Sequence, residues 1–324
     1  MQTIKKTTNF TNLQKISIVK PRGFCAGVDR AIKIVEKALE MYPKPIYIKH
    51  QIVHNTHITQ RFADLGAITI ENISDIPNNS VVIFSAHGSP PQDFKQAKEK
   101  NITVIDAVCP LVLKVHLSVK NLDNKGHKII YIGNKKHIEA KSVKAQNTSI
   151  ISIIENEDDI KSLSNKLKNE KLACLTQTTL NVEKTEKIIE KLKEKFPNIL
   201  LQNKSDICYA TTNRQNALKQ IEKQVDMLLI VGSKNSSNTN KLLQLAKKNQ
   251  KPAYLIEDIT QIEEGWFTIN IKTVGISSGA SVPDDLVQDI IKYFKEQNLQ
   301  TKEIMNIEEN MVFPLPKFPT LIKK

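Results

Sequence analysis

The chain has few of the residues that mark several common protein classes. Aromatic residues make up 5% of its 324 residues, with a single Trp, so an aromatic platform that stacks nucleic-acid bases is not expected. No apolar run reaches the roughly 20 residues that cross a bilayer. The N-terminal segment MQTIKKTTNFTNLQK has lysines but no apolar core, so it does not resemble a secretory signal. We therefore expect a cytoplasmic protein without a membrane partner.

Arginine is also scarce in a strongly basic chain. Lysine and arginine together number 47 against 34 acidic residues, a net charge of +13, yet the only arginines are Arg22, Arg30, Arg61 and Arg214. Bidentate recognition of phosphates and guanine relies on arginine, so we expect no nucleic-acid partner. The positive charge instead favours an anionic substrate or an acidic protein partner.

Cysteines are few, and their positions are informative. No CxxC pair is present, which excludes a zinc ribbon or a thioredoxin-type motif. Cys174 lies in the apolar run LACLT and is expected to be a buried strand residue. The other three each lie between a strand-like run and a helical stretch: Cys25, Cys109 and Cys208.

Short apolar runs alternate with amphipathic helical stretches along the chain. This alternation predicts an α/β fold with mainly parallel sheets. The three similar cysteine settings predict three α/β domains in a pseudo-threefold arrangement, with the thiols meeting at the centre. We place the domains at residues 1–107, 108–205 and 206–299, and expect the tail, residues 300–324, to pack back on the first.

The cysteine settings also indicate metal chemistry. A helix N-terminus favours the thiolate, which is the form that binds metals. Three thiolates suit either a zinc site with one open position or an iron–sulfur cluster with one iron left without a protein ligand. The residues alone leave both alternatives open.

A second set of polar side chains lies in loops at strand ends. His54, His87 and His137 have loop contexts, and Glu139 follows His137 by two residues. Hydroxyl and amide side chains at helix starts, beside free backbone N–H groups, suit an anion such as a diphosphate. The residues of this kind are Ser236, Ser237, Asn238 and Ser281, and Thr178 lies at a further strand end.

Eight ordered blocks together resemble one known family. The blocks are PRGFCAGVDRAI, IVHN, SAHG, DAVCPLVLKVH, TQTTL, DICYATTNRQ, VGSKNSSNTNKL and GASVP. They are similar to those of the 4-hydroxy-3-methylbut-2-enyl diphosphate reductases, which catalyse the last step of the methylerythritol phosphate route to isoprenoids. The resemblance runs from about residue 15 to the tail sequence VFPLPK.

The resemblance implies a cofactor, a reaction and a set of roles. It implies one central 4Fe–4S cluster held by Cys25, Cys109 and Cys208, an electron donor such as ferredoxin or flavodoxin, and loss of the substrate's allylic hydroxyl as water. It assigns proton donation to Glu139, a place near that hydroxyl to Thr178, and a place beside the diphosphate to His137. The diphosphate ligands that it implies are His54, His87, Ser236, Ser237, Asn238 and Ser281.

One block departs from the family pattern. After the histidine the family reads H-x-E-V-x-G-T, whereas the glycine and threonine positions here hold Ser142 and Val143. His137 and Glu139 are kept, so the assignment of the proton donor stands. We expect the rigidity of the segment after Glu139 to differ from that of the family.

Three other functions are compatible with parts of the pattern. An iron–sulfur hydro-lyase would use an open iron to dehydrate another anionic substrate without consuming electrons. A zinc enzyme would use the same three thiolates. A non-catalytic, basic nucleic-acid-binding protein would show binding that weakens steeply with salt.

Overall fold

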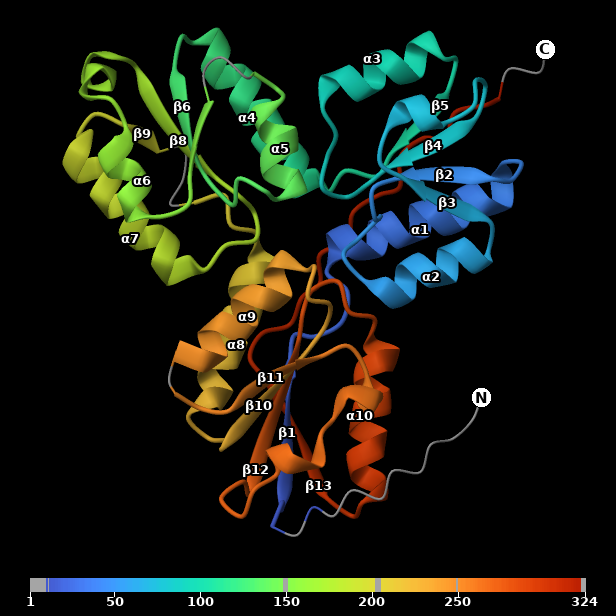
Figure 1. Cartoon of the computed structure of the whole chain (residues 1–324), viewed down its shortest axis with the longest axis vertical. Coiled ribbons are helices and arrows are strands. Elements are labelled where there is room, and N and C mark those ends of the chain that lie inside the picture. The colour runs from blue at the N-terminus through green and yellow to red at the C-terminus, as the bar shows by residue number, and fades with distance from the viewer. Residues whose placement is uncertain (1–9, 11, 148–150, 202–204, 249, 322–324) are drawn as a thin grey trace. The chain divides into compact units, whose positions relative to one another are not determined.

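The structure is a computed structural model that describes residues 10, 12–147, 151–201, 205–248 and 250–321 (Figure 1). It contains three sheets whose strands pair in parallel, with helices between the strands. The predicted α/β class is therefore confirmed, while an arrangement of the sheets about one axis stays a prediction. The chain divides into two compact units: Met1–Phe24 with Thr212–Asn310, and Cys25–Thr211 with Met311–Lys324.

The first sheet of the larger unit has the strand order β3-β2-β4-β5. Parallel strands need a crossover between them, and helices provide it here. Val82 and Phe84 of β4 point to one face, where they pack with Ala97 of the helix α3. The elements are β2 Ile46–Lys49, β3 Ala67–Ile70, β4 Val81–Phe84, β5 Thr103–Asp106, α1 Ala26–Met41, α2 Thr56–Asp64, α3 Pro91–Glu99 and the 3₁₀ turn Ile73–Asp75.

The second sheet of the larger unit has the order β7-β6-β8-β9, and both of its faces are covered. Successive side chains of a strand point to opposite faces. Ile129 and Tyr131 of β6 therefore pack with α4 and α5, whereas Ile130 and Ile132 pack with α6 and α7. The elements are β6 Lys128–Ile132, β7 Ile151–Ile154, β8 Leu172–Thr176, β9 Leu200–Leu201, α4 Pro110–Asn124, α5 Ile138–Lys144, α6 Glu157–Ser162, α7 Val182–Lys195 and the 3₁₀ turn Asn165–Asn169.

The smaller unit is built on a five-stranded sheet of order β11-β10-β12-β1-β13. Leu229 of β10 faces α10, whereas Leu228 and Ile230 face α8 and α9. The elements are β1 Lys15–Lys20, β10 Met227–Val231, β11 Ala253–Ile256, β12 Thr273–Ser278, β13 Gln300–Met305, α8 Tyr209–Glu222, α9 Ser237–Lys248, α10 Asp284–Glu296 and the 3₁₀ turns Ile259–Gln261 and Glu264–Trp266.

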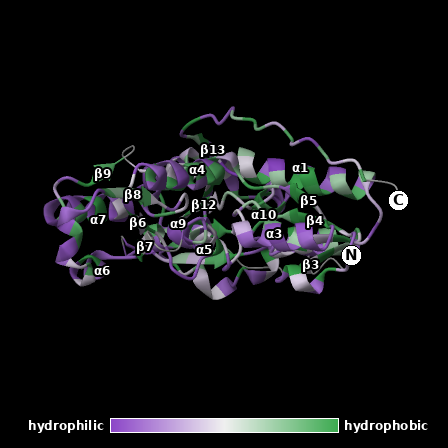
Figure 2. Ribbon diagram, turned by 90° about the horizontal axis from the view of Figure 1, so that it is seen from above, coloured by the Kyte–Doolittle hydropathy of each residue, from purple (hydrophilic) through white to green (hydrophobic). Residues whose placement is uncertain are grey.

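The helices are amphipathic, and in Figure 2 they carry both hydrophilic and hydrophobic residues. Such helices bury one face and leave the other to solvent. In the part of the chain that the structure describes, no helix combines the length and the apolar character that spanning a membrane requires.

The strand β1 lies in a different sheet from the one that we expected. We placed it in a first domain of residues 1–107, but β1 pairs in parallel with β12 and β13. The predicted tail, residues 300–324, is likewise divided, because β13 is a strand of this sheet. Further along the tail, Arg30 Nε donates to Pro314 O at 2.8 Å and the Tyr42 hydroxyl to Pro319 O at 2.6 Å, so this stretch lies along α1. Residues 1–9, 11 and 322–324 of the predicted ranges lie outside the described residues.

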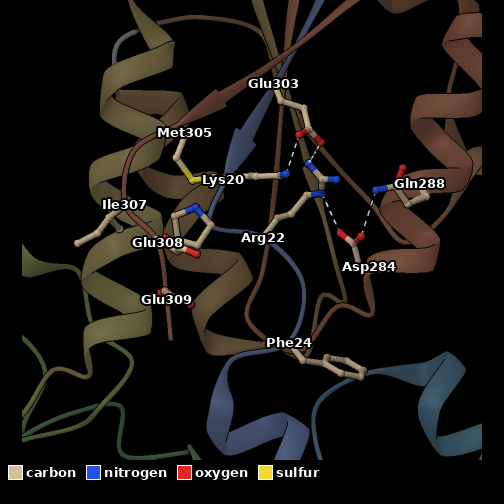
Figure 3. A pocket seen from close by; sticks show the side chains of 11 residues that line it. Lys20, Arg22, Phe24, Asp284, Gln288, Glu303, Met305, Ile307, Glu308 and Glu309 are labelled. Atoms are coloured by element: carbon tan, nitrogen blue, oxygen red, sulfur yellow. Dashed lines mark hydrogen bonds and ion pairs between the residues drawn. The ribbon is translucent and has the colours of Figure 1, made fainter. Parts of the chain in front are cut away.

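Ion pairs tie the ends of several elements together in the smaller unit. Arg22 lies between two carboxylates, with Nε 2.8 Å from Asp284 Oδ1 and Nη1 2.6 Å from Glu303 Oε1 (Figure 3). Lys20 Nζ adds a contact of 2.6 Å to Glu303 Oε2. These pairs line a pocket of about 460 Å³ and join the segment after β1 to β13 and to the start of α10.

A buried ion pair in the same unit predicts a large effect on stability. The Arg214 side chain is 0% exposed, and its Nη1 lies 3.2 Å from Glu309, whose side chain is 12% exposed. Glu309→Gln removes the charge that compensates Arg214, so we expect the free energy of unfolding to fall by about 3–5 kcal/mol. Chemical denaturation measures it. The exposed pair Lys191–Glu194 provides the control, since Glu194→Gln should change stability by about 0.5 kcal/mol or less. Equal effects of the two variants would contradict this prediction.

Candidate active site

Each of the three predicted thiols belongs to the larger unit and lies at the start of a helix. Cys25 is the N-cap residue of α1, Cys109 is the N-cap residue of α4, and Cys208 directly precedes α8. Proline at the first position of α4 is preorganised for a helix start. The N-terminal end of a helix carries a partial positive charge, which stabilises an anionic sulfur.

The thiols also lie near one another. A Cβ added at Gly27 would lie 2.5 Å from Cys109 Sγ and 4.0 Å from Cys25 Sγ, so only glycine leaves room between the two sulfurs. Burial, and then the neighbouring thiols, raise the pKa of Cys109 to about 12. Burial, and then Cys25, raise the pKa of Cys208 to about 11. Cys109 thus responds to both other thiols and Cys208 responds to Cys25, so the three lie close together at helix N-termini.

The positions of the thiols bear on the kind of metal group that they could hold. Among the described residues, no three His, Cys, Asp or Glu side chains are close enough to share one ion. A zinc site of three cysteines needs its sulfurs about 2.3 Å from one metal. In a polynuclear iron–sulfur cluster each thiolate binds a different iron, so the sulfurs lie further apart. The thiols and the glycine that gives them room fit a cluster better than zinc.

Glu139 and Thr178 form a hydrogen-bonded link to the backbone of Cys208. Glu139, 2% exposed, accepts from Thr178 N at 2.8 Å and from Thr178 Oγ1 at 2.9 Å. Thr178 O in turn accepts from Cys208 N at 3.0 Å. The carboxyl group is thus held beside the cysteine segment by Thr178, the second residue after β8.

The Glu139 carboxyl has the acid strength of a proton donor for neutral pH. Burial raises its pKa to about 7, and the two Thr178 hydrogen bonds oppose this rise. Nearby Asp206 raises it further. A general acid works best when its pKa lies near the working pH. The site therefore holds a carboxyl group that is partly protonated when most carboxyl groups are fully ionised.

The three predicted histidines come together in the same unit. The ring centroids lie 4.2 Å apart for His54 and His87, 5.4 Å for His54 and His137, and 5.8 Å for His87 and His137. His137 is the N-cap residue of α5, and its Nδ1 accepts from Glu139 N at 3.2 Å. Through His137, the imidazole cluster is therefore connected to α5, the helix that carries Glu139.

Burial keeps the imidazoles of His54 and His87 neutral in the free chain. Burial, and then His50, lower the pKa of His54 to about 4. Burial, and then His54 and His137, lower the pKa of His87 well below its ordinary value. A bound polyanion would reverse this effect, because it favours the protonated imidazole. The cluster thus has the electrostatic character of an anion site.

Ser142 connects three of these elements, and the sequence did not indicate this role. Its Oγ lies 2.9 Å from Glu139 O and 3.1 Å from His87 O, so one proton serves two carbonyls. His116 Nε2, which we had not assigned to the site, lies 3.2 Å from the same Oγ. A Cβ at Gly88 would lie 2.6 Å from His116 Cε1, so the turn after His87 packs directly on this histidine.

Two further groups near Glu139 escaped the sequence analysis. Asp206 Oδ2 accepts from Thr176 N at 3.0 Å, which fixes the chain two residues before Cys208. Tyr131 is 0% exposed, and Glu139 raises the pKa of its hydroxyl after burial. Tyr131 lies in an apolar run that is typical of a core strand, so the sequence does not indicate that it lies beside the carboxyl group.

The remaining predicted residues lie in the smaller unit. Ser236 Oγ accepts from Thr239 N at 3.3 Å, and Ser281 Oγ donates to Ser236 Oγ at 3.5 Å. Ser237 is the first residue of α9. Asn238 is 5% exposed, and among the described residues neither its Nδ2 nor its Oδ1 has a hydrogen-bond partner. A buried amide without partners beside hydroxyls and a helix N-terminus suits an anion.

Comparison with known proteins identifies the class of enzyme. Curated relatives named 4-hydroxy-3-methylbut-2-enyl diphosphate reductase include that of Haemophilus influenzae strain PittGG, 46% identical over 307 residues that make up 94% of this chain and 97% of the relative. That of Pectobacterium atrosepticum is 45% identical over 308 residues, 94% and 96% of the two chains. The protein is thus an oxidoreductase.

Solved structures and a family match extend this result. The E-1-hydroxy-2-methyl-but-2-enyl-4-diphosphate reductase from Plasmodium falciparum has a TM-score of 0.89 at 36% identity, covering 95% of this chain and 96% of that one. A structure described as (E)-4-hydroxy-3-methyl-but-2-enyl diphosphate reductase, the terminal enzyme of the non-mevalonate pathway, has a TM-score of 0.63 at 30% identity, covering 88% and 100%. The family described as LytB protein matches residues 16–295. The chain belongs to this family.

The contacts of Ser142 predict a measurable loss of stability. Ser142→Ala removes the hydroxyl that bonds to His87 O and leaves His116 Nε2 without this partner. We expect the free energy of unfolding to fall by about 1–3 kcal/mol. Chemical denaturation measures it, with the exposed Ser74→Ala as a control that should change stability by about 0.5 kcal/mol or less. A Ser142→Ala protein as stable as the control would remove Ser142 from this network.

Proposed function

We propose that this chain reduces (E)-4-hydroxy-3-methylbut-2-enyl diphosphate to isopentenyl and dimethylallyl diphosphate. The reaction consumes two electrons and two protons. The C–O bond of the allylic hydroxyl breaks, the oxygen leaves as water, and one new C–H bond forms. The observation that carries the proposal is the hydrogen-bonded link from Glu139 through Thr178 to the backbone of Cys208, which supports Glu139 as a proton donor near the thiols.

The proposal assigns one 4Fe–4S cluster to Cys25, Cys109 and Cys208. Three thiols at helix N-termini, with Gly27 giving room between two of the sulfurs, support this assignment. When bound, the cluster supplies electrons and an open iron that acts as a Lewis acid toward the hydroxyl oxygen. The electrons come from a carrier protein such as ferredoxin or flavodoxin.

The chain's own residues handle the protons. Hydroxide is a poor leaving group, so protonation of the departing oxygen lowers the barrier. Glu139 holds that proton on a carboxyl group whose orientation Thr178 fixes through two hydrogen bonds. The Thr178 hydroxyl orients the substrate oxygen toward Glu139 when it accepts or donates a hydrogen bond there.

The anion-binding groups hold the substrate's diphosphate. The neutral imidazoles of His54 and His87 gain protons, or donate the N–H that they have, as the negative charge arrives. His137 lies beside them through its ring contacts with both. The proposal also assigns the hydroxyl and amide groups to the diphosphate, since they suit an anion in the same way: Ser236, Ser237, Asn238 and Ser281.

The test is anaerobic purification, iron and sulfide analysis, and an assay with the allylic diphosphate. We expect a brown protein with about four irons per chain that oxidises reduced methyl viologen only when the substrate is present. Turnover without a reductant would instead indicate a hydro-lyase. A colourless protein with one zinc per chain would indicate a zinc enzyme.

Glu139 should govern the pH dependence of the reduction. Its pKa of about 7 means that the acid form predominates below neutral pH and is lost above it, so the rate should fall as the pH rises through about 7. Glu139→Gln should lower turnover by about 100-fold or more and leave the iron content unchanged. The exposed Glu170→Gln serves as the control. A Glu139→Gln enzyme with normal turnover would exclude the carboxyl group as the donor.

Replacement of Asn238 should weaken substrate binding without lowering the stability of the protein. Asn238→Leu removes a buried amide that has no partner in the free chain, so the free energy of unfolding should stay unchanged or rise. The KM for the diphosphate substrate should rise about 10-fold, as expected for the loss of a hydrogen bond to a charged group. The exposed Asn235→Ala is the matched control for both measurements. An unchanged KM in the Asn238→Leu enzyme would separate Asn238 from the substrate.

A further inference from the structure

The outward face of α4 carries an apolar patch. The helix buries Val112, Val115 and Val119 against its sheet. On the opposite face Leu113 is 41% exposed and Leu117, one turn later, is 56% exposed. Single exposed leucines are common, but two on one helix turn that also line a hollow mark an interaction surface. The hollow measures about 350 Å³, and its lining is Pro110, Leu113, Lys114, Leu117, Ser118 and Asn121.

The charged side chain that lines this hollow is basic. The hollow is lined by the cation Lys114 and by no acidic residue. Lys120 and Lys125 are also exposed on the same helix and its end, and no ion pair involves these three lysines among the described residues. The whole chain carries a net charge of +13. A surface with an apolar centre and a basic edge is complementary to an acidic protein with an apolar contact of its own.

The patch also begins next to one of the thiols. Pro110 lines the hollow and directly follows Cys109, the N-cap residue of the same helix. The reaction needs electrons from outside, and an electron carrier must approach its acceptor closely before it can deliver them. Electron-transfer proteins associate through small, weak interfaces that opposite charges steer. A shallow apolar hollow with lysines, one residue from Cys109, has the properties of such an interface.

We propose that the outward face of α4, around Leu113, Lys114 and Leu117, is the docking surface for an acidic electron-carrier protein. This rests on the proposed function, because only a reductase needs such a partner. The occupant is an iron–sulfur or flavin protein with a negative surface. It contacts the two leucines with an apolar group and the lysines with carboxylates.

Two variants test the surface through its charge and its apolar centre. Lys114→Glu and Leu117→Gln each change one exposed side chain and leave the buried face of α4 intact. With reduced ferredoxin as the donor, we expect kcat/KM for ferredoxin to fall about 10-fold in each. With dithionite, a small reductant that needs no docking, the rate should match that of the unmodified enzyme. The matched controls are the exposed Lys187→Glu on α7 and Leu200→Gln on β9, which should change neither rate.

Binding provides a readout that does not depend on turnover. Oxidised ferredoxin is titrated onto the immobilised chain, and we expect the affinity to fall with salt and to fall about 10-fold in both variants. Ferredoxin binding and ferredoxin-driven rates equal to those of the unmodified chain in both variants would overturn the proposal. Self-association that Leu117→Gln abolishes, with unchanged ferredoxin binding, would assign the face to a second copy and overturn it too. Failure of the proposed function is distinct, since the unmodified enzyme would then not oxidise dithionite with substrate.

Discussion

The structure depends on burying ionisable groups close together without opposite charges among them. Burial raises the pKa of Glu139, Cys109 and Cys208 and lowers that of His54 and His87. Each shift favours the neutral form of the group, which costs less free energy than a buried charge. A cationic centre near the thiols and a polyanion near the imidazoles would each supply the missing charge. The site is thus complementary to ligands that bring opposite charges to its two ends.

Rigid helices and strands hold these buried ionisable groups in place. The thiols sit at the first residues of helices that follow parallel strands, and α4 and α5 bury their inner faces in one core with β6 and β8. Thr178 is the second residue after β8, so the residue that donates to the Glu139 carboxyl is placed by a strand with no exposed residue. Groups on such elements lose little freedom when a ligand binds, and preorganisation of this kind strengthens electrostatic catalysis.

Local chemistry was readable from the sequence, whereas long-range pairing was not. The loops that carry Cys25, His87 and Asn238 follow recognisable strands, so their places at strand ends could be predicted. The apolar run of β1 also predicted a strand, but an apolar run does not indicate which other strands it pairs with. β1 pairs with β12 and β13, more than 250 residues away in the chain, and only the packed sheet shows this. Tyr131 and His116 were missed for a related reason, because a core position and a ligand-contacting position have the same helical or strand periodicity.

Ser142 shows how a departure from a family pattern can be accommodated. A serine where the family has glycine adds a side chain to a crowded place, beside the turn at Gly88. Here Ser142 is 1% exposed within α5, where glycine would cost helix stability. Its hydroxyl donates to His87 O on the neighbouring turn and to Glu139 O in its own helix. Val143, at the threonine position, is 0% exposed in the core that α4 and α5 share. The serine therefore adds hydrogen bonds to the segment after Glu139, whereas the valine places a methyl group where threonine has its hydroxyl. We expect the serine contacts to stiffen the link between α5 and the His87 turn.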